Sequence, residues 1–288
     1  MAAPIMRQTT QATFIKLLFF VAMALGAPPG WLAAAAENQA ETAMRQHMNG
    51  LMQFVATNRA LALQQTLAGL EKAPTRQLWG VDLAMIFGSD RRLAQPLSGA
   101  ERVKRFGECR EYLQRGLALA ERALQAHAGD QSLTYQVGEI KCALALASLE
   151  TGDTAMVKNL ARQELAAYAQ PRDWNYGNVI HSAHALLGRA ALREGDQAAA
   201  AGHLLKAGAT PGSPQLSSFG PDFTLARELL EAGDAKTVLA YLDLVQKFWV
   251  DEVRKSAGAL AERLAGEHAA KLDQWRAEIR AGRKPKGW

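Results

Sequence analysis

Apolar side chains recur every three or four residues along most of the chain, a spacing that predicts amphipathic α-helices. Pro74 interrupts the first of these patterns, and the turn at Gly129 and Asp130 separates two later ones. In the last pattern we expect one or two helices, with a break near Gly266. The expected helices cover residues 44–70, 79–87, 101–126, 136–149 and 250–279.

A repeated turn signal marks the second half of the chain. Three glycines, each followed by aspartate, share leucines eight and three residues before them and a small residue seven before; the pairs are Gly152-Asp153, Gly195-Asp196 and Gly233-Asp234. Such a glycine ends a helix in the left-handed conformation, and the aspartate caps the next helix. Apolar residues five and nine positions after each glycine are expected to face back onto the first helix. Each unit is therefore a helix, a tight turn and an antiparallel helix.

This pattern resembles the tetratricopeptide repeat. The best copy covers residues 184–211, and the matching residues are Leu187, Gly188, Ala191, Gly195, Ala200, Leu204, Ala207 and Pro211. The copy departs from the family because Ala191 stands where an aromatic residue is usual. The glycines are also 43 and 38 residues apart, against about 34 in the family. The resemblance covers about residues 110–250 and implies a fold but no activity.

A second resemblance, over residues 173–249, is to a set of uncharacterised bacterial proteins, and it too implies no chemistry. The matching residues are Asn175-Tyr176-Gly177-Asn178, His181, Leu187-Gly188-Arg189, Gly212-Ser213-Pro214-Gln215-Leu216, Ser218-Phe219-Gly220-Pro221 and Phe248-Trp249. We predict an all-α protein whose antiparallel helix pairs stack as a short tetratricopeptide-like α-solenoid, with flanking N- and C-terminal helices. The expected segments are a signal peptide (1–36), an N-terminal helical segment (37–98), the repeats (99–250) and a C-terminal capping helix with a basic tail (251–288).

The first 36 residues have the features of an export signal. Arg7 and Lys16 precede an apolar run over residues 17–27, and small residues follow at 33–36. The run of 11 residues is shorter than the roughly 20 needed to cross a bilayer, so cleavage near Ala36 is favoured over a retained anchor. We therefore expect a periplasmic or secreted protein with no transmembrane segment after cleavage.

The charge and the cysteines of the chain bear on its possible partners and on disulfide formation. The formal charge of +5 is a weak excess that does not indicate nucleic-acid binding. Basic residues gather near the C-terminus, where a solvated, frayed end is favoured over weak contact with an anionic surface; they are Arg276, Arg280, Arg283, Lys284 and Lys286. Cys109 and Cys142 lie at unequal distances from the turn at Gly129. The mismatch is about 10 Å along the helix axes, so two separate thiols are expected.

The first candidate site is the segment of Trp174, Asn175 and Tyr176 together with His181 and His184. On a helix starting near Asn175 the two histidines share one face, which suggests a ligand pocket or a metal pair. The alternative is a polar contact between helices. Because two imidazoles supply only two ligands and no third has a matching spacing, we expect no metal and no cofactor.

The second candidate is the long loop over residues 210–221, with Gln215, Ser218 and Phe219 as binding candidates. Loops of this length in helical repeats are often functional. The favoured alternative is that the loop packs inward on Trp174, Tyr176 and Phe248 and fixes the helix stack.

A methionine row with an adjacent histidine suggests copper(I) binding, although core packing is favoured; its members are Met44, Met48, Met52 and His47.

No phosphate-binding loop, dinucleotide fingerprint, zinc-protease motif or paired-carboxylate signature is present, so we expect no enzyme. The leading hypothesis is an interaction scaffold that binds a protein or peptide partner in the cell envelope. The alternatives are a small-ligand or metal-binding protein that uses residues 175–184 and 210–221, and an enzyme in the same pocket.

Overall fold

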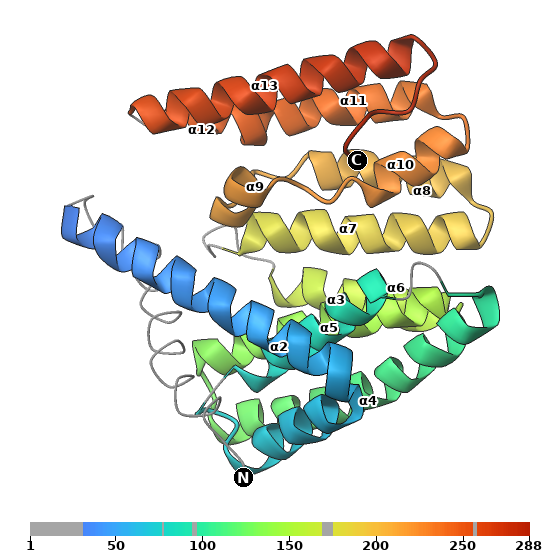
Figure 1. The fold of residues 1–288 in the computed structure, drawn as a ribbon. Helices are drawn as coiled ribbons and strands as arrows, with labels where there is room; N and C mark the ends of the chain where they lie inside the picture. The colour runs from blue at the N-terminus through green and yellow to red at the C-terminus, as the bar shows by residue number, and fades with distance from the viewer. Residues whose placement is uncertain (1–30, 77, 94–96, 169–174, 256–257) are drawn as a thin grey trace. The chain divides into compact units, whose positions relative to one another are not determined.

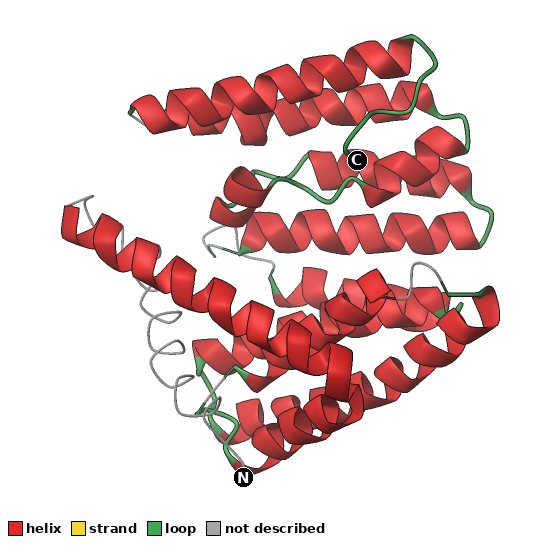
Figure 2. Cartoon of the chain, viewed as in Figure 1, coloured by secondary structure: helices red, strands yellow, loops and turns green. Residues whose placement is uncertain are grey.

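The computed structural model describes residues 31–76, 78–93, 97–168, 175–255 and 258–288, and all secondary structure within these ranges is helical (Figures 1 and 2). The predicted all-α fold class is confirmed. The chain divides into two compact units, Met1–Thr151 (unit 1) and Gly152–Trp288 (unit 2). Among the described helices, none combines the length and the apolar character that a bilayer span requires. Most of the expected signal peptide and the run around Trp174 lie outside the described residues.

Unit 1 contains four described helices: α2 (Trp31–Lys72), α3 (Trp79–Leu93), α4 (Gly99–Ala126) and α5 (Gln131–Glu150). Helix α2 begins upstream of the expected cleavage position and is kinked at Asn58, whose backbone is non-helical (φ −141°). Helix α5 starts five residues earlier than expected, because the Asp130 side chain caps it by accepting from the Leu133 N–H group. The side chains of Met44, His47, Met48 and Met52 lie outside the described part of α2.

Arg59 ties α2 to α4 in unit 1. Its guanidinium donates to Oε2 of Glu108 at 2.9 Å and to Sγ of Cys109 at 3.0 Å. Cys109 is buried on α4, whereas Cys142 lies on α5, and the two are not joined in a disulfide. The expectation of two separate thiols is confirmed.

Unit 2 holds the remaining helices, which follow one another in layers from α7 to α13 (Figure 1). They are α6 (Thr154–Ala167), α7 (Tyr176–Arg193), α8 (Gln197–Gly208), α9 (Pro214–Phe219), α10 (Thr224–Glu231), α11 (Ala235–Gln246), the π-helical η1 (Lys247–Asp251), α12 (Glu252–Lys255) and α13 (Ala259–Arg280). The break expected near Gly266 is wrong. The chain breaks at Gly258 instead, whose φ of 131° suits glycine, whereas Gly266 lies inside α13 with open space at its Cβ position.

The predicted glycine–aspartate turns are confirmed. Gly152, Gly195 and Gly233 have φ values of 81°, 82° and 89°. The aspartate after each accepts a hydrogen bond from the N–H group three residues further on, and the three acceptors are Asp153, Asp196 and Asp234. The apolar positions after the turns are buried as expected; they are Val157, Ala161, Ala200, Leu204, Val238 and Leu242. Helices α7 and α8, and helices α10 and α11, are therefore antiparallel pairs within unit 2.

The C-terminal segment is docked onto unit 2, so the expected frayed end is wrong. The indole N–H of Trp275 donates to the Lys286 carbonyl oxygen at 3.0 Å, and the Lys286 N–H donates to Glu278 at 2.9 Å. The Trp288 ring stacks on Phe223 with ring centroids 5.5 Å apart. The basic residues of this segment suggested solvation, but the aromatic contacts hold its backbone against α13.

Candidate functional site

The structure describes two of the three candidate residues at the start of α7, Asn175 and Tyr176. Asn175 is the N-cap residue and is buried, and its Oδ1 accepts a hydrogen bond from Asn178 at 3.3 Å. Tyr176 is partly exposed. Trp174 lies outside the described residues. The side chains of Gln215, Ser218 and Phe219 also lie outside them, although their backbone forms α9.

His181 is buried and hydrogen-bonded inside unit 2. Only 3% of it is exposed, and its Nε2 lies 2.9 Å from the hydroxyl oxygen of Tyr241 on α11. Burial lowers the pKa of His181 to about 4, against a partial opposing effect of Asp222. Burial also raises the pKa of Tyr241 well above its usual value. At neutral pH both groups are therefore uncharged, and the hydrogen bond between them is a structural link between α7 and α11.

The loop over residues 210–221 packs inward, and it contains the short helix α9, which was not predicted. The Thr210 hydroxyl donates to the Gly177 carbonyl oxygen at 2.6 Å. A Cβ atom on Gly177 would overlap the carbonyl oxygen of Gly212, so glycine is required for this approach. A Cβ on Gly212 would lie 2.8 Å from the Cβ of Phe248. The loop therefore packs between α7 and η1. Its contact with Phe248 agrees with the alternative favoured from the sequence, in which the loop packs inward.

His184 does not join His181 in a common site but pairs with His203 on α8, a residue that the sequence reasoning missed. Their Nδ1 atoms are 3.1 Å apart and their ring centroids 5.3 Å apart. Burial, and then His203 and Lys206, lower the pKa of His184 to about 4. Burial, Lys206 and Arg162 lower the pKa of His203. Both rings are therefore neutral at pH 7, and one Nδ1–H group donates to the other Nδ1 atom.

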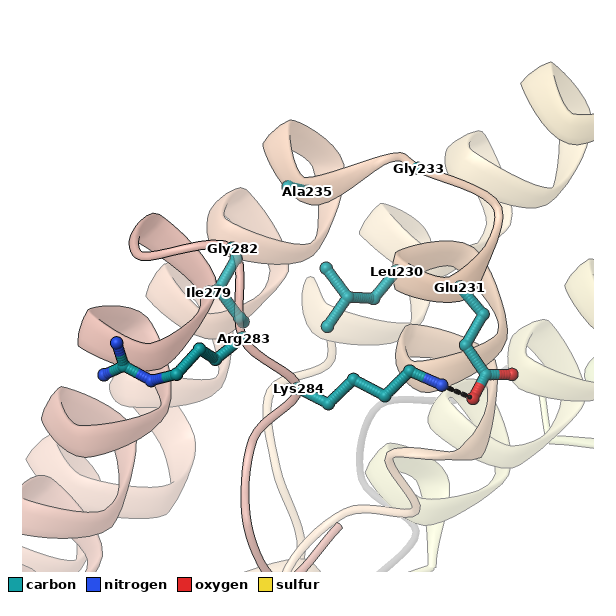
Figure 3. Close-up of a pocket in the computed structure, with 8 residues that line it drawn as sticks. All are labelled: Leu230, Glu231, Gly233, Ala235, Ile279, Gly282, Arg283 and Lys284. Carbon is teal, nitrogen blue, oxygen red and sulfur yellow. Dashed lines mark hydrogen bonds and ion pairs between the residues drawn. The ribbon is translucent and has the colours of Figure 1, made fainter.

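A surface depression lies between the turn of α10 and α11 and the end of α13 (Figure 3), with a volume of about 540 Å³. Its lining residues are Leu230, Glu231, Gly233, Ala235, Ile279, Gly282, Arg283 and Lys284. Lys284 donates to Glu231 at 2.9 Å, and the Arg283 side chain points away from this ion pair. None of the ligand-binding candidates proposed from residues 174–184 and 210–221 lines the depression, whereas Arg283 and Lys284 belong to the basic C-terminal residues named from the sequence.

The described side chains show no metal-binding cluster. Among them, no group of three or more histidine, cysteine, aspartate or glutamate side chains is arranged to hold a metal ion. Comparison of the chain with protein-family models, curated proteins and solved structures finds no match.

Proposed function

We propose that this chain is an exported helical-repeat scaffold that binds a protein or peptide partner in the cell envelope. The observation that carries the proposal is the hydrogen bond between His181 and Tyr241. This hydrogen bond places His181, a leading candidate for ligand binding, in a contact inside unit 2. The second candidate region, the loop over residues 210–221, is likewise engaged with Gly177 and Phe248. With His181 and the ends of the loop engaged inside the unit, the solvent-exposed faces of the stacked helix pairs are the surfaces that we propose for binding.

The first helices of successive pairs are the best candidate for the partner surface. Helix α10 packs against α7, and first helices line the concave surface in stacked helical repeats. Arg193 on α7 and Arg227 on α10 are exposed, and Arg193 also forms an ion pair with Glu228 at 3.5 Å. Glu228, which lies beside Arg227, accepts from the buried guanidinium of Arg189 at 3.1 Å and so fixes the two helices together. The exposed arginines favour a partner segment with acidic side chains.

We also propose that the chain is related to tetratricopeptide-repeat proteins and that it is exported. The glycine–aspartate turns and the small residue Gly188, which packs against Leu225, support the kinship. The basic and apolar composition of residues 1–36 supports export. Sequencing the N-terminus of the protein from the periplasmic fraction tests export. A start near residue 37 is expected, and a start at Met1 with the protein in the membrane fraction would contradict it.

Affinity capture from envelope extract tests the scaffold function. We compare the wild-type chain with the double variant Arg193→Gln/Arg227→Gln, which removes both charges without placing a second carboxylate beside Glu228, and with the control Arg263→Gln. The control replaces an exposed arginine on α13 that lies 3.9 Å from Glu267. One protein should be retained by the wild type and the control and lost by the double variant. Equal retention by all three would exclude this surface, and a co-purifying small molecule without a protein would favour the ligand-binding alternative.

A further inference from the structure

The paired histidines of α7 and α8 have two facing ring nitrogens with room for only one proton between them. Gly188 allows the two helices to approach, since a Cβ there would lie only 3.2 Å from the Cβ of His203. The Nδ1 atoms of His184 and His203 face each other at 3.1 Å. Two neutral imidazoles satisfy this contact with a single shared proton. A second proton on this pair of nitrogen atoms would place two N–H groups against each other, and both would need an acceptor.

The charges around the pair are cationic. Lys206, one turn after His203 on α8, acts electrostatically on both rings, and Arg162 on α6 acts on His203. Both side chains are exposed, and Arg162 also lowers the pKa of Glu194. His181, one turn before His184, is already bound to Tyr241.

The acidic residues of the helices packed around the pair are engaged elsewhere. Ion pairs join Glu194 to Lys158, Glu228 to Arg189, and Asp243 to Arg276. Glu164 on α6 has an interaction of its own. No acid is among the groups that shift the pKa of His184 or His203. The histidine pair and Lys206 therefore have no neutralising carboxylate from these ion pairs, and an anion from solution would supply the negative charge.

We propose that His184, His203, Lys206 and Arg162 form a proton-coupled binding site for a doubly charged oxyanion, such as sulfate or a phosphate group. The bound oxyanion would accept from the two Nδ1–H groups after one proton is taken up from solvent, while the lysine and arginine neutralise its charge. A divalent metal is disfavoured because the pair supplies only two ligands and the neighbouring side chains are cationic. This site is separate from the proposed partner surface on α7 and α10. An experiment can therefore contradict the oxyanion site without contradicting the partner surface, and the reverse also holds.

A sulfate titration of the full chain, followed by NMR of the histidine ring nitrogens, tests the site. Sulfate keeps its charge between pH 5 and pH 8, so any pH dependence belongs to the protein. We expect saturable shifts of both His184 and His203, and a sulfate Kd that rises about tenfold per pH unit above pH 6, since one proton is taken up per anion. His127, an exposed histidine in unit 1, should not respond.

Two variants keep the test decisive if one of them folds poorly. The exposed Lys206→Met should raise the sulfate Kd several-fold while it raises the pKa of the pair, and His203→Asn should abolish the pH dependence. His127→Asn is the matched control and should behave as the wild type does. Non-saturable shifts, pH-independent binding, or equal binding by Lys206→Met would overturn the proposal. At pH 6, binding of inorganic phosphate but not of O-phosphoserine identifies a free oxyanion as the ligand, and binding of both identifies a phosphomonoester group.

Discussion

The hydroxyl group of Tyr241 lies 2.9 Å from Nε2 of His181, and both side chains are buried in unit 2. The contact joins α11 to α7, two helices from different pairs. Because neither group is accessible to solvent, removing one partner leaves the other buried without a hydrogen bond, which costs more than the bond itself contributes.

Tyr241→Phe should therefore lower the free energy of unfolding by about 1–3 kcal/mol, because Nε2 of His181 loses its hydrogen-bond partner. Urea denaturation followed by tryptophan fluorescence measures this change. The matched control is Tyr176→Phe at a partly exposed position, where a change within about 0.5 kcal/mol is expected. If the two variants unfold alike, the hydroxyl of Tyr241 does not stabilise the fold.

The same pair makes stability depend on pH. The pKa of His181 is about 4 in the folded protein and its ordinary value is 6.5, so the unfolded chain binds a proton that the folded protein excludes. The stabilisation is complete above pH 6.5 and is lost progressively as the pH falls to 4, by about 3 kcal/mol in all. Urea denaturation at pH 7.5, 6 and 5 measures the trend. In His181→Gln the dependence should shrink, and an unchanged dependence would assign it to other groups.

Gly177→Ala should be strongly destabilising, by about 3 kcal/mol or more, since the new methyl group would overlap the backbone carbonyl of Gly212. Gly202→Ala is the matched change on α8, where nothing lies within 4 Å of the Cβ position. It should stabilise the protein by about 0.5–1 kcal/mol through helix propensity. Thermal unfolding of the two variants should shift the Tm in opposite directions, and a neutral Gly177→Ala would argue against the close approach.

Asp196→Ala should cost about 1 kcal/mol, because the Asp196 carboxylate accepts from the Ala199 N–H at 2.9 Å and caps α8. Asp196→Asn keeps the acceptor and should retain most of the stability. Hydrogen exchange of the first turn of α8 reports the loss locally. Equal exchange in the two variants would show that the cap does not stabilise the turn.

Trp288→Ala should destabilise unit 2 by about 1–2 kcal/mol, because it removes the ring stacked on Phe223. Lys284→Ala removes an ion pair whose side chains are 74% and 46% exposed, so little change is expected. Faster hydrogen exchange at residues 281–287 in Trp288→Ala alone would confirm aromatic docking. The reverse result would assign the docking to charge.

The helix pairs could be predicted because their turns are encoded locally. Gly195 and Asp196 each perform a task that depends only on neighbouring backbone groups. Helix α9 also had a local signal, Ser213 as N-cap followed by Pro214 at the first helical position, but its six residues are too short for periodicity to reveal.

The docked C-terminal segment depends on contacts between elements far apart in the sequence, which no local signal reveals. Trp288 meets Phe223, 65 positions away in the sequence. The pairing of His184 with His203 followed from the register of the hairpin around Gly195, where the two residues lie roughly opposite each other. Considering histidines along a single helix grouped His184 with His181, although the structure gives them different partners.

The π-helical segment η1 has a consequence for the alignment of the last helices. A π-turn accommodates one more residue than an α-turn, which rotates everything after it by about 100° around the axis. Phe248, Trp249 and Val250 are consecutive, and all three are buried. In an uninterrupted α-helix these three side chains would fan over about 200°, so one of them would be directed toward water. Deleting a single residue within Lys247–Asp251 would therefore rotate the helix that follows, so that buried side chains become exposed and exposed ones become buried. Most single substitutions there would alter only one side chain.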